Sequence, residues 1–174
     1  MRALADAERI RRFMRALGTE AVEEGAVYFT GGATAVLLGW RASTLDVDIL
    51  LVPEQESVLR AVPRLKNELQ VNVELASPRD FIPVPDGWED RSIFTAREGR
   101  LSFYHFDPYA QALAKIERGH AQDLEDVRAL LERGLVDPAR ALTYLDEIEP
   151  ELYRYPAVDA ASFRRRVEEA FLAR

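Results

Sequence analysis

Apolar residues recur along the first half of the chain with two different periods, and these periods predict the order of its elements. Runs in which apolar and polar residues alternate predict strands, whereas apolar residues three and four positions apart predict helices. The predicted elements are a helix over 3–17, a strand over 26–30, a helix over 32–38, a strand over 45–52, a helix over 54–68 and a strand over 69–75. Two further runs, 92–96 and 101–106, predict a hairpin around Arg97-Glu-Gly-Arg100. We therefore expect a sheet of about five strands.

The second half of the chain predicts helices only. Asp107-Pro108 and Asp137-Pro138 each place an N-cap aspartate before a proline in the first helical turn. Further helices are predicted over 122–132 and 160–172. Together these patterns predict an α/β (α+β) fold, with a mixed sheet flanked by helices and followed by C-terminal helices. We expect residues 1–106 to form the core and residues 107–174 to pack on it as one compact unit.

A proline-rich segment, 76–91, separates the third strand from the hairpin. It contains three prolines and one glycine, so no regular element of any length is expected there. It also carries Phe81, Ile82 and Trp88, which predict an ordered loop that packs against the protein. These side chains either form a stacking surface for a base or an acceptor, or cover the sheet.

Composition narrows the chemistry that the chain can perform. Cysteine is absent and there are two histidines, so disulfides and thiolate sites are excluded and a metal ion would be bound by carboxylates. The net charge of -7 argues against a broad nucleic-acid-binding surface. No stretch approaches the roughly 20 consecutive apolar residues of a membrane span, and the N-terminus lacks the apolar segment of a signal peptide. We therefore expect a cytoplasmic protein that does not associate with membranes.

Two short motifs, Gly31-Gly32 and Asp46-x-Asp48, carry the clearest chemical signal. Asp46 and Asp48 are two positions apart on a predicted strand, so both point to one face while Val47 and Ile49 point into the core. Such a pair can hold divalent metal ions. The glycines lie between a strand and a helix, where the backbone can approach a phosphate closely. This order places a triphosphate beside the metal ions that bridge its oxygens.

With this spacing the segment resembles the signature of the nucleotidyltransferase superfamily, which has the DNA-polymerase-beta-like fold. Gly31 and Gly32 match the glycine motif, and Asp46 and Asp48 match the metal-binding pair. The resemblance implies a minimal nucleotidyltransferase fold, Mg²⁺ or Mn²⁺ as cofactor and an NTP as substrate. A third carboxylate usually completes such a site. Glu74 on the next strand is expected to serve there as a catalytic and metal-binding residue, where the family pattern most often has aspartate. The alternative is a solvated glutamate at a strand end.

The helical half contains a second group of charged residues. Lys115 and Arg118 are three positions apart on one predicted helix, and Asp123 and Asp126 have the same spacing on the next. Lys115 is one of only two lysines among the 23 Lys and Arg residues, so a specific role is expected for it. A compact ammonium charge suits a triphosphate. The alternative is a solvated charged face.

This stretch resembles the lysine, arginine and aspartate motifs of abortive-infection-type nucleotidyltransferases, whose members include toxins of toxin–antitoxin pairs. The resemblance implies that Lys115 is catalytic and contacts the nucleotide phosphates together with Arg118. It also implies that Asp123 is a catalytic aspartate, and that an antitoxin protein is a partner.

Other polar residues have weaker signals. Arg41, Ser43 and Thr44 precede the acidic strand and can donate hydrogen bonds to phosphate or to metal-bound water, although turn chemistry also explains the two hydroxyl residues. His105 and His120 are interpreted as polar surface residues. The run Arg164-Arg-Arg166 is interpreted as a solvated helix face.

The preferred interpretation is a metal-dependent nucleotidyltransferase that moves a nucleotidyl group from an NTP to a hydroxyl acceptor. The acceptor can be an RNA 3′ end, a protein hydroxyl or a small molecule, and the residues do not choose among these. One alternative is a catalytically inactive nucleotide-binding or protein-interaction module on the same fold. Another is a metal-dependent phosphohydrolase, which uses similar carboxylates but does not need the glycine turn.

Overall fold

The computed structural model describes residues 3–172, which form two compact units. The first unit contains the residues up to Ser77 together with Ser92–His105. The second contains Pro78–Arg91 together with the residues from Phe106 onward. The proline-rich segment thus belongs to the helical unit, although it lies between two strands in the sequence.

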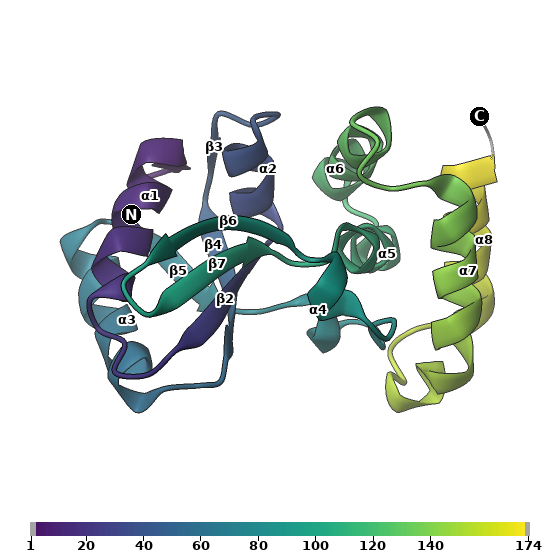
Figure 1. Cartoon of the computed structure of the whole chain (residues 1–174). Coiled ribbons are helices and arrows are strands. Elements are labelled where there is room, and N and C mark those ends of the chain that lie inside the picture. The colour runs from purple at the N-terminus through teal and green to yellow at the C-terminus, as the bar shows by residue number, and fades with distance from the viewer. Residues whose placement is uncertain (1–2, 173–174) are drawn as a thin grey trace. The chain divides into compact units, whose positions relative to one another are not determined.

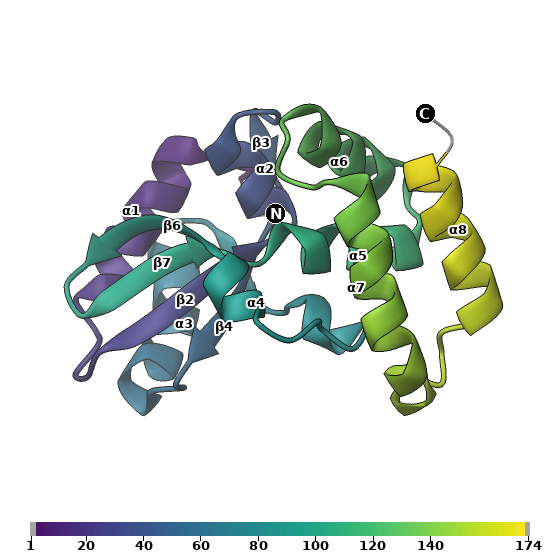
Figure 2. The same cartoon turned by 45° about the vertical axis from the view of Figure 1, so that its right-hand side comes forward.

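A mixed five-stranded sheet with the strand order β5-β4-β2-β7-β6 forms the centre of the first unit (Figures 1 and 2). Its strands are β2 (Gly25–Thr30), β4 (Asp46–Val52), β5 (Asn72–Leu75), β6 (Ile93–Glu98) and β7 (Leu101–His105). β2 runs antiparallel to β4 and parallel to β7, and β4 runs parallel to β5. The predicted mixed sheet of five strands is therefore confirmed.

The helices of the first unit are α1 (Ala7–Gly18), α2 (Gly32–Leu38) and α3 (Glu56–Glu68). The first helix begins later than predicted because the Asp6 carboxylate caps it, accepting from the Arg9 amide at 2.9 Å. Ala5 and the cap residue itself form a short strand, β1 (Ala5–Asp6), which pairs with β3 (Ser43–Thr44). This small second sheet was not predicted.

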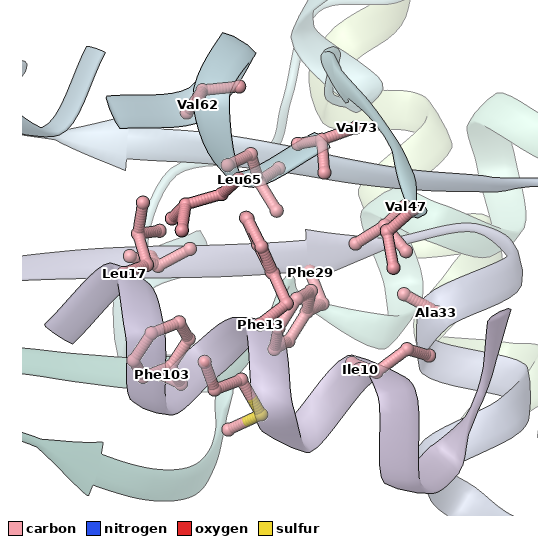
Figure 3. Close-up of a cluster of buried hydrophobic side chains, with 14 of the residues drawn as sticks. Ile10, Phe13, Leu17, Phe29, Ala33, Val47, Val62, Leu65, Val73 and Phe103 are labelled. Atoms are coloured by element: carbon pink, nitrogen blue, oxygen red, sulfur yellow. The ribbon is translucent and has the colours of Figure 1, made fainter. Parts of the chain in front are cut away.

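Apolar side chains of α1 and of the sheet share one core (Figure 3). Ile10, Phe13 and Leu17 recur three and four positions apart along α1 and are fully buried. Phe29 of β2 and Val47 of β4 belong to the same cluster. Burial of each large apolar side chain contributes roughly 1.5–3 kcal/mol to stability, so this cluster determines which face of each strand points inward.

The second unit is helical, as the sequence predicts. Its elements are α4 (Trp88–Arg91), α5 (Pro108–Arg118), α6 (Ala121–Glu132), α7 (Pro138–Ile148) and α8 (Ala160–Leu172), with 3-10 helices at Pro78–Asp80 and Glu149–Arg154. Asp107 and Asp137 cap α5 and α7 by accepting from backbone amides of the first turn. Gly119 ends α5 with a left-handed φ of +71°. Over the described range, no helix is both long and apolar enough to cross a bilayer.

The proline-rich segment contains a 3-10 turn and one four-residue helix, where no regular element was expected. Arg91 holds the segment to α5 by an ion pair with the fully buried Asp107 carboxylate, with Nη2 and Oδ2 2.8 Å apart. Burial raises the pKa of the Asp107 carboxyl, and the hydrogen bond from Arg91 opposes that shift. Trp88 stacks on Phe106 with ring centroids 4.5 Å apart and an interplanar angle of 2°. These contacts order the segment within the helical unit.

Candidate active site

β4 carries the two aspartates that the sequence predicts to bind metal. Val47 and Ile49 are fully buried in the core cluster, so alternation directs Asp46 and Asp48 to the other face of the sheet. Both aspartates are half-buried, and Asp48 lies opposite Thr30 of β2. The two carboxylates therefore share one partly accessible surface.

The neighbouring strand β5 brings two more polar residues to this face. In parallel register, Asn72 lies opposite Asp46 and Glu74 lies opposite Asp48. Paired residues of neighbouring strands point to the same side of a sheet, so Glu74 shares the face of both aspartates. The Asn72 side-chain amide donates to an Asp46 carboxylate oxygen and lies 3.4 Å from Glu74 Oε1. The expected adjacency of the two strands is confirmed, and the role of the exposed Glu74 stays a prediction.

The Gly31-Gly32 turn connects β2 to α2 directly beside Asp48. Gly31 has a φ of +63°, a conformation that other residues rarely adopt, and a Cβ added there would lie 3.2 Å from Asp48 Oδ2. A Cβ added at Gly32 would lie 2.0 Å from Thr44 Oγ1. The first position therefore requires glycine for its backbone conformation, and the second requires it for the close approach of Thr44.

The residues that precede β4 support the same turn. Thr44 is buried, and its hydroxyl donates to the Asp46 carbonyl at 3.1 Å. A Cβ at Gly32 would lie 3.3 Å from Arg41 Nη1, so the Arg41 guanidinium reaches the glycine turn. Ser43 is half-buried in the small sheet with β1. Thr44 thus positions the backbone at the start of β4, and Arg41 brings a positive charge to the turn.

In the second unit, Lys115 and Arg118 of α5 face Asp123 and Asp126 of α6. Lys115 Nζ lies 2.7 Å from Asp126 Oδ2 and 3.4 Å from Asp123 Oδ1, and all three side chains are less than a tenth exposed. Arg118 is 38% exposed, and its Nε lies 3.5 Å from Asp123 Oδ2. That oxygen is buried without a hydrogen-bond partner in the described part of the chain. The alternative of a solvated charged face is wrong for the three buried residues, whereas their role in nucleotide binding stays a prediction.

His105 is not the surface residue that was predicted, because only 3% of it is exposed. Its Nδ1 lies 3.0 Å from the Thr34 hydroxyl, and burial lowers the pKa of His105 to about 4. The sequence did contain a signal for this position, because Leu101, Phe103 and His105 alternate along β7 and the first two are buried in the core. His120, by contrast, is exposed as expected.

The basic run on α8 is also less solvated than predicted. Arg164 pairs with carboxylates of α7, of the following 3-10 helix and of its own helix, which raise its pKa. Arg166 Nη1 donates to the carbonyls of Ile116 and Glu117 at 3.1 and 2.8 Å. It thereby satisfies the unpaired carbonyls at the end of α5. Arg165 remains exposed, as expected.

Comparison with known families agrees with the fold and the motifs. Residues 6–150 match a family described as "Nucleotidyltransferase of unknown function (DUF6036)". The chain belongs to this nucleotidyltransferase family, and the matched region contains the glycine turn, the aspartate pair and the charged residues of α5 and α6. The predicted superfamily is therefore confirmed, whereas the resemblance to the abortive-infection-type enzymes stays a prediction. None of the curated proteins or solved structures compared with the sequence matches it.

Proposed function

We propose that this protein is a metal-dependent nucleotidyltransferase that transfers a nucleotidyl group from an NTP to a hydroxyl acceptor. The position of Asp48 supports this proposal most strongly. Its Oδ2 lies against the Gly31 backbone, on the sheet face that also carries Asp46 and Glu74. A phosphate-binding turn and a carboxylate pair are therefore adjacent, which is the arrangement that a nucleotide with a bound metal ion requires.

Asp46 and Asp48 fit a magnesium or manganese ion, because they present hard carboxylate oxygens on one half-exposed surface. Between residues 3 and 172, no group of three or more His, Asp or Glu side chains is placed to hold an ion. Water and phosphate oxygens would therefore supply the remaining ligands, which is usual for magnesium. When bound, the ion would neutralise charge on the phosphates.

The other residues of this face would bind and orient the reactants. The amides of Gly31 and Gly32 would donate to phosphate oxygens, and Arg41 would add positive charge at the same turn. The acceptor oxygen would attack the α-phosphorus in line, with pyrophosphate as the leaving group. Glu74 would take the proton from the attacking hydroxyl, because its exposed carboxylate lies beside Asp48 at the accessible edge of this face.

The acceptor would be an RNA 3′ end, a protein hydroxyl or a small molecule. A more specific proposal is that the protein acts as a toxin with an antitoxin partner. Only the resemblance of the Lys115–Asp123 stretch to abortive-infection-type nucleotidyltransferases supports it. The net charge of -7 favours an acceptor that does not require a broad basic surface.

A transfer assay tests the catalytic part of the proposal. The protein is incubated with each α-labelled NTP, Mg²⁺ and total cellular RNA or protein, and transferred label is measured. We expect label transfer from at least one NTP by the wild type and by Asp90→Asn, which changes an exposed aspartate of α4. Asp48→Asn should abolish the transfer. Equal transfer by Asp48→Asn and the wild type would rule out the proposed role of Asp48.

Thermal unfolding tests nucleotide binding independently of transfer. A ligand that binds only the folded state stabilises it by RT ln(1 + [L]/Kd), about 2.7 kcal/mol at a hundredfold excess over Kd. We expect an NTP with Mg²⁺ to raise the Tm of the wild type and of Asp90→Asn, and Asp48→Asn to lose the metal-dependent part. Absence of a shift with every NTP and both metal ions would contradict the nucleotide site.

A second candidate function is a nucleotide-binding module that transfers nothing. It is favoured by one contact, because the Asn72 amide occupies one of the two Asp46 carboxylate oxygens and so competes with a metal ion for it. This candidate predicts a thermal shift with NTP and Mg²⁺ in the absence of transferred label for every acceptor.

A further inference from the structure

The first unit contains a pocket on the helix-covered side of the sheet. It has a volume of about 280 Å³ and is lined by residues of α1, α2 and the β6–β7 hairpin. Met14, Leu37 and Leu38 form apolar walls, whereas Thr95 and His105 bring polar groups to the pocket. A cavity of about 150 Å³ accommodates benzene, so this pocket has room for a substituted ring.

The pocket is separated by the sheet from the face that carries the aspartates. His105 lies opposite Phe29, which lies opposite Ile49 on its other side. These three residues share the buried face, and Asp48 points to the other one. A ligand bound in this pocket would therefore not contact the proposed nucleotide site.

His105 presents a hydrogen-bond acceptor to the pocket. The Thr34 hydroxyl donates to the Phe29 carbonyl at 3.3 Å and lies 3.0 Å from His105 Nδ1. Because a hydroxyl has a single hydrogen, the Thr34 oxygen accepts from Nδ1–H. Nε2 of the neutral ring is then left as an acceptor. The pKa of His105, lowered by burial to about 4, keeps the ring neutral near pH 7.

Thr95 adds a polar group without a partner. β6 is irregular between Phe94 and Ala96, and Thr95 is the residue that has no counterpart on β7. Bulges of this kind redirect side chains and occur next to functional sites. The Thr95 Oγ1 atom is buried, and among residues 3–172 it has no hydrogen-bond partner. Since buried polar atoms are nearly always paired, this hydroxyl is available to a polar group that enters the pocket.

Two arginines of α1 lie at the exposed side of the pocket. Arg15 pairs with Glu8 at 3.1 Å, whereas Arg11 has no ion pair or hydrogen bond within the described range. Glu98 also lines the pocket, and Glu8 neutralises Arg15, so Arg11 is the cation at the opening that has no carboxylate partner in the described residues. The Arg11 guanidinium can therefore pair with an anionic group at the opening.

We propose that this pocket binds a small organic carboxylate that has an apolar body and a hydroxyl group. The carboxylate pairs with Arg11 at the exposed side, because the parallel N–H donors of a guanidinium match two carboxylate oxygens. The apolar body packs against Met14 and Leu38. The hydroxyl donates to Nε2 of His105 at the buried end. This binding site is independent of nucleotide transfer.

Isothermal titration calorimetry and NMR with 4-hydroxybenzoate test the proposal. We expect saturable binding and a shift of the His105 Nε2 nitrogen resonance on saturation. The uncharged 4-hydroxybenzamide and inorganic phosphate should each bind at least about tenfold more weakly, a difference of 1.4 kcal/mol. Benzoate, which lacks the hydroxyl, should bind more weakly without shifting the His105 resonance in the same way.

A pair of adjacent arginines supplies the matched control. Arg11→Gln should weaken 4-hydroxybenzoate binding about tenfold through loss of the guanidinium pair. Arg12→Gln, on the exposed face of the same helix and outside the pocket, should bind as the wild type does. Thr95→Val should bind more weakly while its amide spectrum remains that of a folded protein. The proposal is wrong if the folded wild type binds neither carboxylate saturably, if phosphate binds equally well, or if Arg11→Gln and Arg12→Gln bind alike.

Discussion

Lys115 Nζ lies 2.7 Å from Asp126 Oδ2 between α5 and α6, and both side chains are more than nine-tenths buried. Asp123 contributes a second carboxylate at 3.4 Å. Removing the ammonium would take away the cation that lies between two buried carboxylates, and breaking a buried pair in this way typically costs roughly 3–5 kcal/mol. We expect Lys115→Met to lower the free energy of unfolding by about that amount in a urea titration.

The other lysine of the chain provides the control for this prediction. Lys66 is half-buried on α3, and Lys66→Met should change the free energy of unfolding by less than about 0.5 kcal/mol. Replacing both partners, as in Lys115→Met combined with Asp126→Leu, should recover part of the loss. Equal stability of Lys115→Met and the wild type would show that the pair contributes nothing to folding.

Gly32→Ala should destabilise the first unit, because the new Cβ would lie 2.0 Å from Thr44 Oγ1. Overpacking of this kind typically costs about 1–3 kcal/mol. We expect the loss to be smaller in a Thr44→Gly background, which removes the two side-chain atoms that the new methyl group meets most closely. Urea titrations of the two single variants and the double variant measure this coupling. A cost that is the same in both backgrounds would show that Thr44 is not the reason for glycine at this position.

Trp88→Ala should destabilise the second unit, because the indole stacks on the fully buried Phe106. We expect a loss of about 3 kcal/mol, the lower end of the range for aromatic residues replaced by alanine, since Trp88 is half-buried. Tyr153→Ala, at a side chain that is 79% exposed, should have little effect. Loss of NTP binding with unchanged stability would instead assign Trp88 to ligand recognition.

His105 should make stability depend on pH. In the unfolded chain it binds a proton below about pH 6.5, whereas in the folded protein it does so only below about pH 4. The unfolded state binds more protons between these values, so stability is complete above pH 6.5 and falls as the pH is lowered. The loss from this residue approaches about 3 kcal/mol at pH 4.

Chemical unfolding of the wild type and His105→Asn at pH 7, 5.5 and 4 isolates this contribution, because the variant has no titrating group at the position. The difference in free energy of unfolding between the two proteins should decrease by up to about 3 kcal/mol from pH 7 to pH 4. A difference that is independent of pH would mean that His105 becomes protonated as readily in the folded protein as in the unfolded chain.

Several features of the fold could be predicted because the signals that specify them are local. Asp107 and Asp137 predicted the starts of α5 and α7, since an N-cap bonds only to the next turn of its own helix. Alternation predicted that Asp46 and Asp48 share a face, because successive side chains of a strand point to opposite faces of the sheet. The same rule applied to β7 would have predicted the burial of His105.

By itself, the sequence therefore determined the order of the elements, the inward face of β4 and the glycine turn next to it, because each depends on residues within a few positions of one another. Only the tertiary structure decided that Lys115 and Asp126 are buried, that Thr44 lies against Gly32 and that Arg166 caps α5. These contacts depend on which helix or strand packs on which. That choice is made by the burial of apolar surface over the whole unit, and no local pattern records it.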